Sequence, residues 1–208
     1  MGSAAVKRFL REDYHVIAVA RSGSALGFAE GSPNFELHSV DLANATASKD
    51  FFTEIISLKG QIDVALLLTG GFAAGNVEKT DTTEIERMIG LNFNTVYNAA
   101  RPLFLQMLQN GSGHLVFVGA KSARTAATGK HMLGYALSKS LLVKLRDILN
   151  AEASGTRVTV SVIVPDTLDT VVNRTAMPNA DSSAWTPPEE IADILYGICN
   201  GKGKTGVL

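Results

Sequence analysis

The sequence of 208 residues has only one cysteine, Cys199, so it cannot form an internal disulfide bond. Long apolar runs are also missing, and an uninterrupted run such as residues 64–68 has the length of a strand, far short of a membrane span. The sequence shows no signal peptide. Together these absences predict a protein of the cytoplasm.

The sequence also lacks an excess of either positive or negative charge. The 19 Lys and Arg residues nearly balance the 20 Asp and Glu residues, which gives a net charge of −1. Nucleic acids and anionic membranes are bound by concentrated positive charge, and no basic run is present. We therefore expect no nucleic-acid partner and no membrane partner, and a small-molecule ligand fits the composition better. We assign no residue to a metal site.

Short apolar runs alternate with longer stretches of helical period. The runs cover residues 14–20, 35–40, 62–68, 114–119 and 157–164, and the helical stretches cover residues 3–12, 45–59, 81–109, 132–153 and 187–200. This alternation predicts a doubly wound α/β fold, in which helices cover both faces of a parallel sheet. The length suits a single domain over residues 1–208. Residues 166–185 have weak periodicity and many small or polar side chains, so we expect a lid there.

Tyr135 and Lys139 are four residues apart, so they share one face of the helix predicted at residues 132–153. An ammonium group near a phenol favours the phenolate, which predicts a lowered pKa for Tyr135. A tyrosine of this kind exchanges a proton near neutral pH, as hydride transfer to a carbonyl requires. The same spacing also arises by chance, with a buried ring and a solvated lysine.

Other residues with side chains suited to an active site lie elsewhere in the sequence. Ser122 comes just after the apolar run 114–119, and Asn92 lies in the helical stretch upstream. The run 157–164 ends in a turn from Pro165 to Thr170. Open α/β sheets bind ligands at the carboxyl ends of their strands, so these residues are candidates for one site.

This set of residues resembles the short-chain dehydrogenase/reductase family, whose sites use an Asn, a Ser, a Tyr and a Lys in this order and whose cofactor loop reads Pro-Gly-x-x-x-Thr. The resemblance implies a Rossmann-like fold and a nicotinamide cofactor. It implies that Tyr135 protonates the substrate and that Ser122 orients it. In the same way, Lys139 would bind the nicotinamide ribose and Asn92 would hold a water. Pro165, Leu168 and Thr170 would contact the carboxamide end of the cofactor, although Asp166 stands where the family usually has glycine.

Other positions bear on the rest of the cofactor. Arg21 follows the run 16–20, where an acidic residue would bind the ribose of NAD and an arginine can pair with the 2′-phosphate of NADP. We therefore favour NADPH, with an exposed arginine at a strand end as the alternative. The resemblance places Asp41 and Leu42 at the adenine, with a helix-leading aspartate as the alternative. The remaining candidates are the strand-end residues Thr69, Gly70 and Gly71.

The front of the sequence lacks the strand and the glycine-rich turn that open dinucleotide-binding folds. Gly2 matches the last glycine of the family's Thr-Gly-x-x-x-Gly-x-Gly turn, and residues 3–12 match the helix after it. We therefore expect the first, central strand to be missing and further residues to precede Met1 in the native protein. The alternative is a natural variant that compensates for the missing strand.

Two segments narrow the resemblance within the family. Residues 70–76 and 167–181 look like those of the dihydropteridine reductases, but Arg21, Phe72 and Ser122 depart from that group. We expect an NAD(P)H-dependent reductase of a quinonoid dihydropterin or a similar carbonyl. The alternative is a truncated remnant or a nucleotide-sensing binding protein. Apolar faces on the helical stretches 81–109 and 132–153 predict a homodimer or a higher homo-oligomer.

Overall fold

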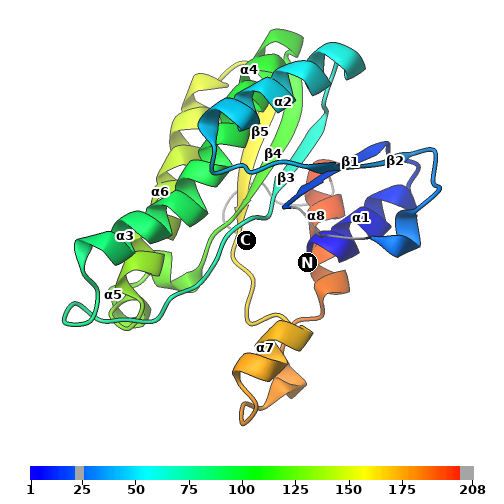
Figure 1. The fold of residues 1–208 in the computed structure, drawn as a ribbon. Helices are drawn as coiled ribbons and strands as arrows, with labels where there is room; N and C mark the ends of the chain where they lie inside the picture. Colours follow the sequence, from blue (N-terminus) through cyan, green and yellow to red (C-terminus); the bar gives the residue numbers. More distant parts are fainter. Residues whose placement is uncertain (22–25, 202–208) are drawn as a thin grey trace. The chain divides into compact units, whose positions relative to one another are not determined.

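The computed structural model describes residues 1–21 and 26–201, which form two compact units (Figure 1). One unit is the continuous segment Asp41–Val164. The other combines Met1–Val40 with residues 165–201. The end of the predicted single domain, residues 202–208, lies outside the described residues.

The segment Asp41–Val164 contains a parallel sheet of three strands in the order β3 (Val64–Leu67), β4 (Ser112–Val118) and β5 (Arg157–Ile163). The last four residues of both β4 and β5 are buried. A parallel strand that is covered on both faces needs apolar side chains on both, which explains why continuous apolar runs predicted these strands. All three carboxyl ends lie at the same edge of the sheet.

Three long helices accompany this sheet: α2 (Ala45–Lys59), α4 (Thr95–Asn110) and α6 (Leu133–Glu152) (Figure 1). Helix α4 contacts β3 and β4, α6 contacts β4 and β5, and α2 packs against α4. Their apolar side chains and those of the strands form the core of this unit. Its completely buried members include Met107, Leu115, Phe117, Leu142 and Val162.

The helical stretch predicted at residues 81–109 is not one α-helix. Helix α3 (Thr82–Ile89) and α4 are separated by a π-helical turn over Gly90–Asn94. Helix α3 begins where the Asp81 carboxylate accepts a hydrogen bond from the amide of Glu84, as an N-cap does. A π turn inserts an extra residue into a helix and is frequent at functional sites. In this chain the inserted turn carries Asn92.

Shorter elements connect β4 to α6. They are the 3₁₀ turn Lys121–Ala123 and the short helix α5 (Ala126–Gly129). The segment before α6 also joins the loop that follows β3, through a bridge between Gly75 and Met132.

The other unit has a parallel pair of strands, β1 (Val16–Ala20) and β2 (Phe35–Ser39), and the 3₁₀ turn Gly27–Ala29. Helices α1 (Gly2–Leu10) and α8 (Pro188–Cys199) pack against each other. Arg8 joins them, because its Nε lies 2.6 Å from Asp193 Oδ1 and its guanidinium lies 4.0 Å from the centre of the Tyr196 ring. Residues far apart in the sequence therefore close this unit.

The predicted lid, residues 166–185, contains the short helix α7 (Val171–Ala176) and the 3₁₀ turn Ser182–Ala184. Backbone hydrogen bonds from Asp169 to Thr186 and from Thr186 to Thr167, both 2.9 Å, close the base of this segment. Helix α7 has no buried residue. That residues 166–185 act as a lid stays a prediction.

In the described part of the chain, β1 pairs only with β2. Within the same residues, β3 is an edge strand that pairs only with β4. Within residues 1–21, the first regular element is α1 rather than a strand. That a strand precedes residue 1 in the native protein stays a prediction.

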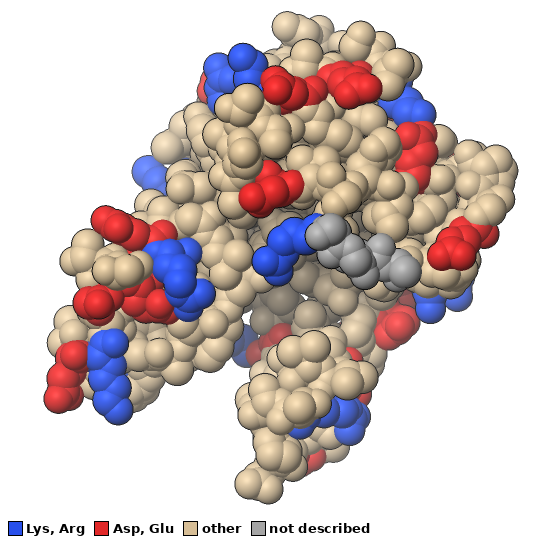
Figure 2. Space-filling model, in the orientation of Figure 1, with Lys and Arg blue, Asp and Glu red and all other residues tan. Residues whose placement is uncertain are grey.

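Two surface properties bear on partners. None of the helices formed by residues 1–21 and 26–201 is long and apolar enough to cross a membrane. Figure 2 shows Lys and Arg side chains interspersed with Asp and Glu side chains on the visible face. That face therefore presents mixed charge.

Candidate active site

A buried asparagine holds the end of β3 against α6. Asn92 has no exposed surface, and its Oδ1 accepts a hydrogen bond from the Gly71 amide at 2.9 Å. Its Nδ2 donates to the Gly71 carbonyl and to Ser138 Oγ, both at 3.1 Å. The sequence predicts a water-binding role for Asn92, and the structure engages its side-chain amide with Gly71 and Ser138.

Gly70 lies where the chain passes closest to these polar groups. A Cβ atom at Gly70 would lie 2.6 Å from Asn92 Oδ1 and 3.1 Å from Lys139 Nζ, so no other residue fits without a shift. The preceding Thr69 is exposed. The three strand-end candidates thus follow β3 beside a buried amide and a buried ammonium, with Thr69 and Gly70 exposed and Gly71 half-buried.

Lys139 is 3% exposed and projects toward the carboxyl end of β4, where its Nζ donates to the Val118 carbonyl at 2.9 Å. Burial disfavours the ammonium and lowers the pKa of Lys139 to about 8. The Nζ lies 5.9 Å from the centre of the Tyr135 ring. The lysine and the tyrosine therefore share one face of α6, as predicted.

The predicted direction of the Tyr135 pKa is wrong for the structure as it stands. Burial raises the pKa of Tyr135, because removing the phenolate from water is unfavourable. The sequence shows that a lysine is four residues away but not how far the ring is buried. A raised pKa keeps the phenol protonated at neutral pH, which is the form that a proton donor needs.

Ser122 lies in the 3₁₀ turn that follows β4 and is 8% exposed. Its Oγ is buried and has no hydrogen-bond partner among the described residues. A buried hydroxyl without a partner is costly, so it commonly marks a position that a ligand or water satisfies. The turn is tied to α6, because Ser140 Oγ donates to the Ala123 carbonyl at 3.2 Å.

The segment Asp41–Val164 thus brings together the four predicted catalytic side chains at the carboxyl ends of β3 and β4. It also contains the pair predicted at the adenine. Asp41 is exposed, and its Oδ1 accepts from the amide of Ala43 at 3.0 Å, whereas Asn44 caps α2. The Leu42 carbonyl accepts from Asn98 Nδ2 at 2.9 Å. Asp41 therefore shapes a turn before the helix and does not cap it.

The remaining candidates belong to the other unit. Gly2 starts α1 and is exposed, and a Cβ there would meet no atom within 4 Å. Arg21 is exposed directly after β1, and Pro165 is half-buried. The contacts of these three residues with a cofactor stay predictions.

The last two candidates lie at the start of the predicted lid. Thr170 Oγ1 caps α7 by accepting from the Asn173 amide at 3.2 Å. The Leu168 carbonyl accepts from Asn173 Nδ2 at 2.8 Å. Asn173 thus holds both residues in place. Their contacts with a cofactor also stay predictions.

Ser138 is a further buried polar residue of the site, and its sequence position did not predict it. Its Oγ is completely buried, donates to the Tyr135 carbonyl at 2.8 Å and accepts from Asn92. A polar residue between Tyr135 and Lys139 on an apolar helix face was the available signal. Residues 1–21 and 26–201 contain no group of three or more His, Cys, Asp or Glu side chains that could hold a metal ion.

Known proteins resemble this chain in sequence. The sequence matches the model of the short chain dehydrogenase family over residues 1–181. The dihydropteridine reductase of Dictyostelium discoideum is 27% identical, over 94% of this chain and 81% of that protein. The 3-oxoacyl-[acyl-carrier-protein] reductase MabA of Mycobacterium tuberculosis H37Rv is 25% identical, over 82% of this chain and 66% of that protein.

Solved structures agree on the fold. A putative short-chain dehydrogenase/reductase from Burkholderia xenovorans superposes with a TM-score of 0.87 at 20% identity, covering 100% of this chain and 87% of that one. ElxO with NADP bound superposes with a TM-score of 0.88 at 17% identity, covering 100% of this chain and 91% of that one. These structures share the Rossmann-like α/β fold. With its family match, its parallel sheets and its Asn, Ser, Tyr and Lys residues in order, the chain belongs to the short-chain dehydrogenase family of oxidoreductases.

Proposed function

We propose that this oxidoreductase uses NADPH to reduce a quinonoid dihydropterin or a similar carbonyl, with Tyr135 as the acid. The observation that carries the proposal is a half-buried Tyr135 ring on the same helix face as the buried Lys139, whose Nζ lies 5.9 Å from the centre of that ring. A nearby buried hydroxyl, Ser122 Oγ, has no partner among the described residues and suits the acceptor atom. The similarity to the D. discoideum dihydropteridine reductase supports the substrate class.

The residues present fit a nicotinamide cofactor. Gly70 has no room for a side chain beside Asn92 and Lys139, so only backbone lines that position and a ligand can approach it closely. When bound, the cofactor supplies the hydride. We propose that it is held by Gly2, Arg21, Asp41, Leu42, Thr69, Gly70, Gly71, Tyr135, Lys139, Pro165, Leu168 and Thr170.

The proton is handled by the chain's own side chains. Tyr135 holds it on the phenol oxygen and releases it to the acceptor atom as the acceptor is reduced. Ser122 orients that atom by a hydrogen bond from Oγ. The Lys139 ammonium stabilises the phenolate that forms, because opposite charges attract strongly in a buried site. Asn92 holds Gly71 and supports the turn, and residues 166–185 serve as a lid that excludes bulk water.

We further propose that both units act together as one reductase domain. A location in the cytoplasm suits an NADPH-dependent enzyme whose single thiol is unreactive. Cys199 is buried, and burial raises its pKa to about 12.

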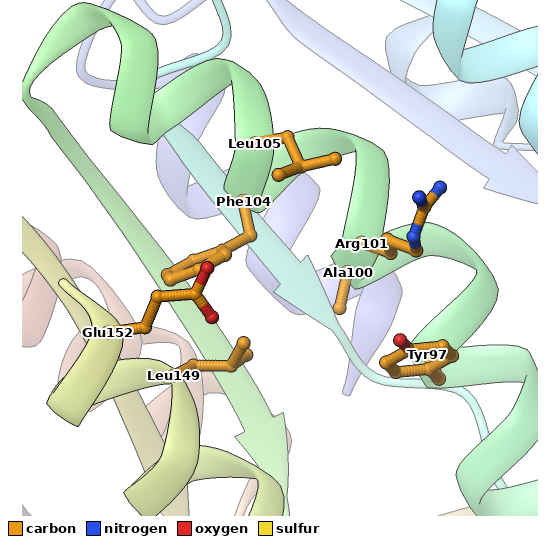
Figure 3. Close-up of a pocket in the computed structure, with 7 residues that line it drawn as sticks. All are labelled: Tyr97, Ala100, Arg101, Phe104, Leu105, Leu149 and Glu152. Carbon is orange, nitrogen blue, oxygen red and sulfur yellow. The ribbon is translucent and has the colours of Figure 1, made fainter.

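A homodimer is proposed from a groove between α4 and α6 (Figure 3). Its lining residues are Tyr97, Ala100, Arg101, Phe104, Leu105, Leu149 and Glu152. Leu105 is 42% exposed, and Ile148 of α6 is 52% exposed. Arg101 and Glu152 carry opposite charges on one face. A twofold axis would therefore let Arg101 of one copy pair with Glu152 of the other, and the reverse.

Replacing Tyr135 by phenylalanine should lower turnover by ~10²-fold or more while cofactor binding survives, because only the proton donor is lost. Steady-state kinetics with a quinonoid dihydropterin measure the effect. Tyr14→Phe, which removes another phenol hydroxyl, serves as the control. Full turnover in the Tyr135 variant would contradict the assigned role, and a wild-type protein that binds NADPH but reduces nothing would favour the nucleotide-sensing alternative.

Lys139→Met should change how stability depends on pH. The ammonium loses its proton near pH 8 in the folded chain, against an ordinary pKa of 10.5. Between these values the unfolded chain binds more protons, so rising pH should stabilise the wild type relative to the variant. Urea unfolding on both sides of pH 8 measures the difference, with the exposed Lys144→Met as the matched control. A difference that does not change with pH would contradict a depressed lysine pKa.

Arg21→Asp should shift the cofactor preference from NADPH toward NADH, because a guanidinium that pairs with the 2′-phosphate is replaced by a carboxylate that repels it. The ratio of kcat/KM values for the two cofactors measures the shift. Arg11→Asp, at another exposed position of the same unit, is the control. An unchanged ratio would assign the phosphate to another residue.

Sedimentation velocity at micromolar concentration should show a homodimer. Leu105→Asp should dissociate it, since a buried, unpaired carboxylate in an interface is strongly unfavourable. Leu58→Asp on α2, where the leucine is 69% exposed, should leave the dimer intact. A wild-type monomer would rule out this interface.

A further inference from the structure

An exposed aromatic ring stands directly beside the proposed acid. Phe72 is 61% exposed, yet its ring contacts that of Tyr135 edge-on, with centroids 5.2 Å apart and an interplanar angle of 69°. Single exposed apolar side chains are common and need no special explanation. Phe72 differs because its neighbour is the residue that donates the proton.

The backbone on both sides of Phe72 is fixed to the elements that surround Tyr135. On one side, the Asn92 side chain binds both the amide and the carbonyl of Gly71. On the other, the Gly75 amide donates to the His131 carbonyl, and its carbonyl accepts from the Leu133 amide, each at 2.8 Å. Leu133 is the first residue of α6, so the loop is fastened to the helix of the tyrosine.

Close packing reinforces these hydrogen bonds. A Cβ at Gly71 would lie 2.5 Å from Leu91 Cδ2, and a Cβ at Gly75 would lie 2.6 Å from Thr80 Oγ1. A larger residue at either position would force the side chain of Leu91 or Thr80 to shift, so both glycines favour the close approach of the loop. The loop holds Phe72 next to Tyr135 at a defined position, while most of the Phe72 ring surface stays open to a ligand.

We propose that Phe72 forms an aromatic wall of the substrate site and selects acceptors whose reducible group belongs to a flat, conjugated ring. This inference rests on the proposed function, because the acceptor atom must lie at the Tyr135 hydroxyl. With that atom in place, the body of the acceptor lies along the neighbouring Phe72 ring. Flat rings gain offset-stacked or edge contacts with an aromatic side chain that an open-chain carbonyl cannot make.

The size of the effect follows from the strength of ring pairs. One such ring pair raises the affinity for a ligand by ~3- to 10-fold, in addition to the contribution of the apolar area that it buries. Phe72→Leu keeps an apolar side chain of similar reach and removes the aromatic face. The variant should therefore lose affinity for flat acceptors in KM while kcat and small acceptors change little.

The first experiment compares phenanthrenequinone, a flat acceptor, with diacetyl, a small open-chain acceptor, at saturating NADPH. We expect Phe72→Leu to lower kcat/KM for the quinone by ~3- to 10-fold, mainly through KM, and to change that for diacetyl by less than ~2-fold. Phe72→Trp should retain the quinone activity. Phe28→Leu removes another exposed aromatic ring, and as the control it should change neither acceptor.

A second measurement needs no turnover. Calorimetric titration with naphthol, a flat ring that the enzyme cannot reduce, should show ~3- to 10-fold weaker binding to Phe72→Leu than to the wild type. Equal binding by the two proteins, or an equal loss of activity on both acceptors, would overturn the proposal. Weaker naphthol binding without reduction of either acceptor would support the aromatic wall and refute the proposed reductase activity.

Discussion

The hydrogen bonds of the Asn92 side chain hold the candidate site together. One buried amide satisfies both backbone groups of Gly71 and reaches Ser138, which in turn binds the carbonyl of Tyr135. The end of β3, the π turn and α6 are therefore joined by buried hydrogen bonds. An amide is suited to this position because it offers a donor and an acceptor without a charge that burial would penalise.

The fold could be predicted from the sequence because its signals are local. The five strands and the helices α1, α2, α6 and α8 lie within a few residues of the predicted ranges. The most buried strands contain apolar runs, and the helices repeat their apolar residues at helical spacing. The π turn could not be predicted. Its apolar spacing continues that of the helices on either side, and the extra residue is stabilised by the tertiary contacts of Asn92.

The candidate site was predicted by residue type and order, but its electrostatics were not. Spacing placed Lys139 and Tyr135 on one face, and the structure has them there. The pKa of Tyr135 depends on how much water reaches the ring, which is a property of the folded chain. Ser138 was missed for a related reason, because its two partners come from separate parts of the sequence.

The pairing of α1 with α8 bears on the order in which the chain can fold. Arg8 meets Asp193 and Tyr196, so the unit that contains both helices is assembled from the beginning and the end of the chain. During synthesis, the segment Asp41–Val164 leaves the ribosome complete and can pack its own core first. Helix α1 can pack against β1 and Tyr14 early, but it must wait for α8 to cover the rest of the apolar face that carries Ala5 and Phe9. A nascent chain would thus be vulnerable to chaperone capture or aggregation at helix α1.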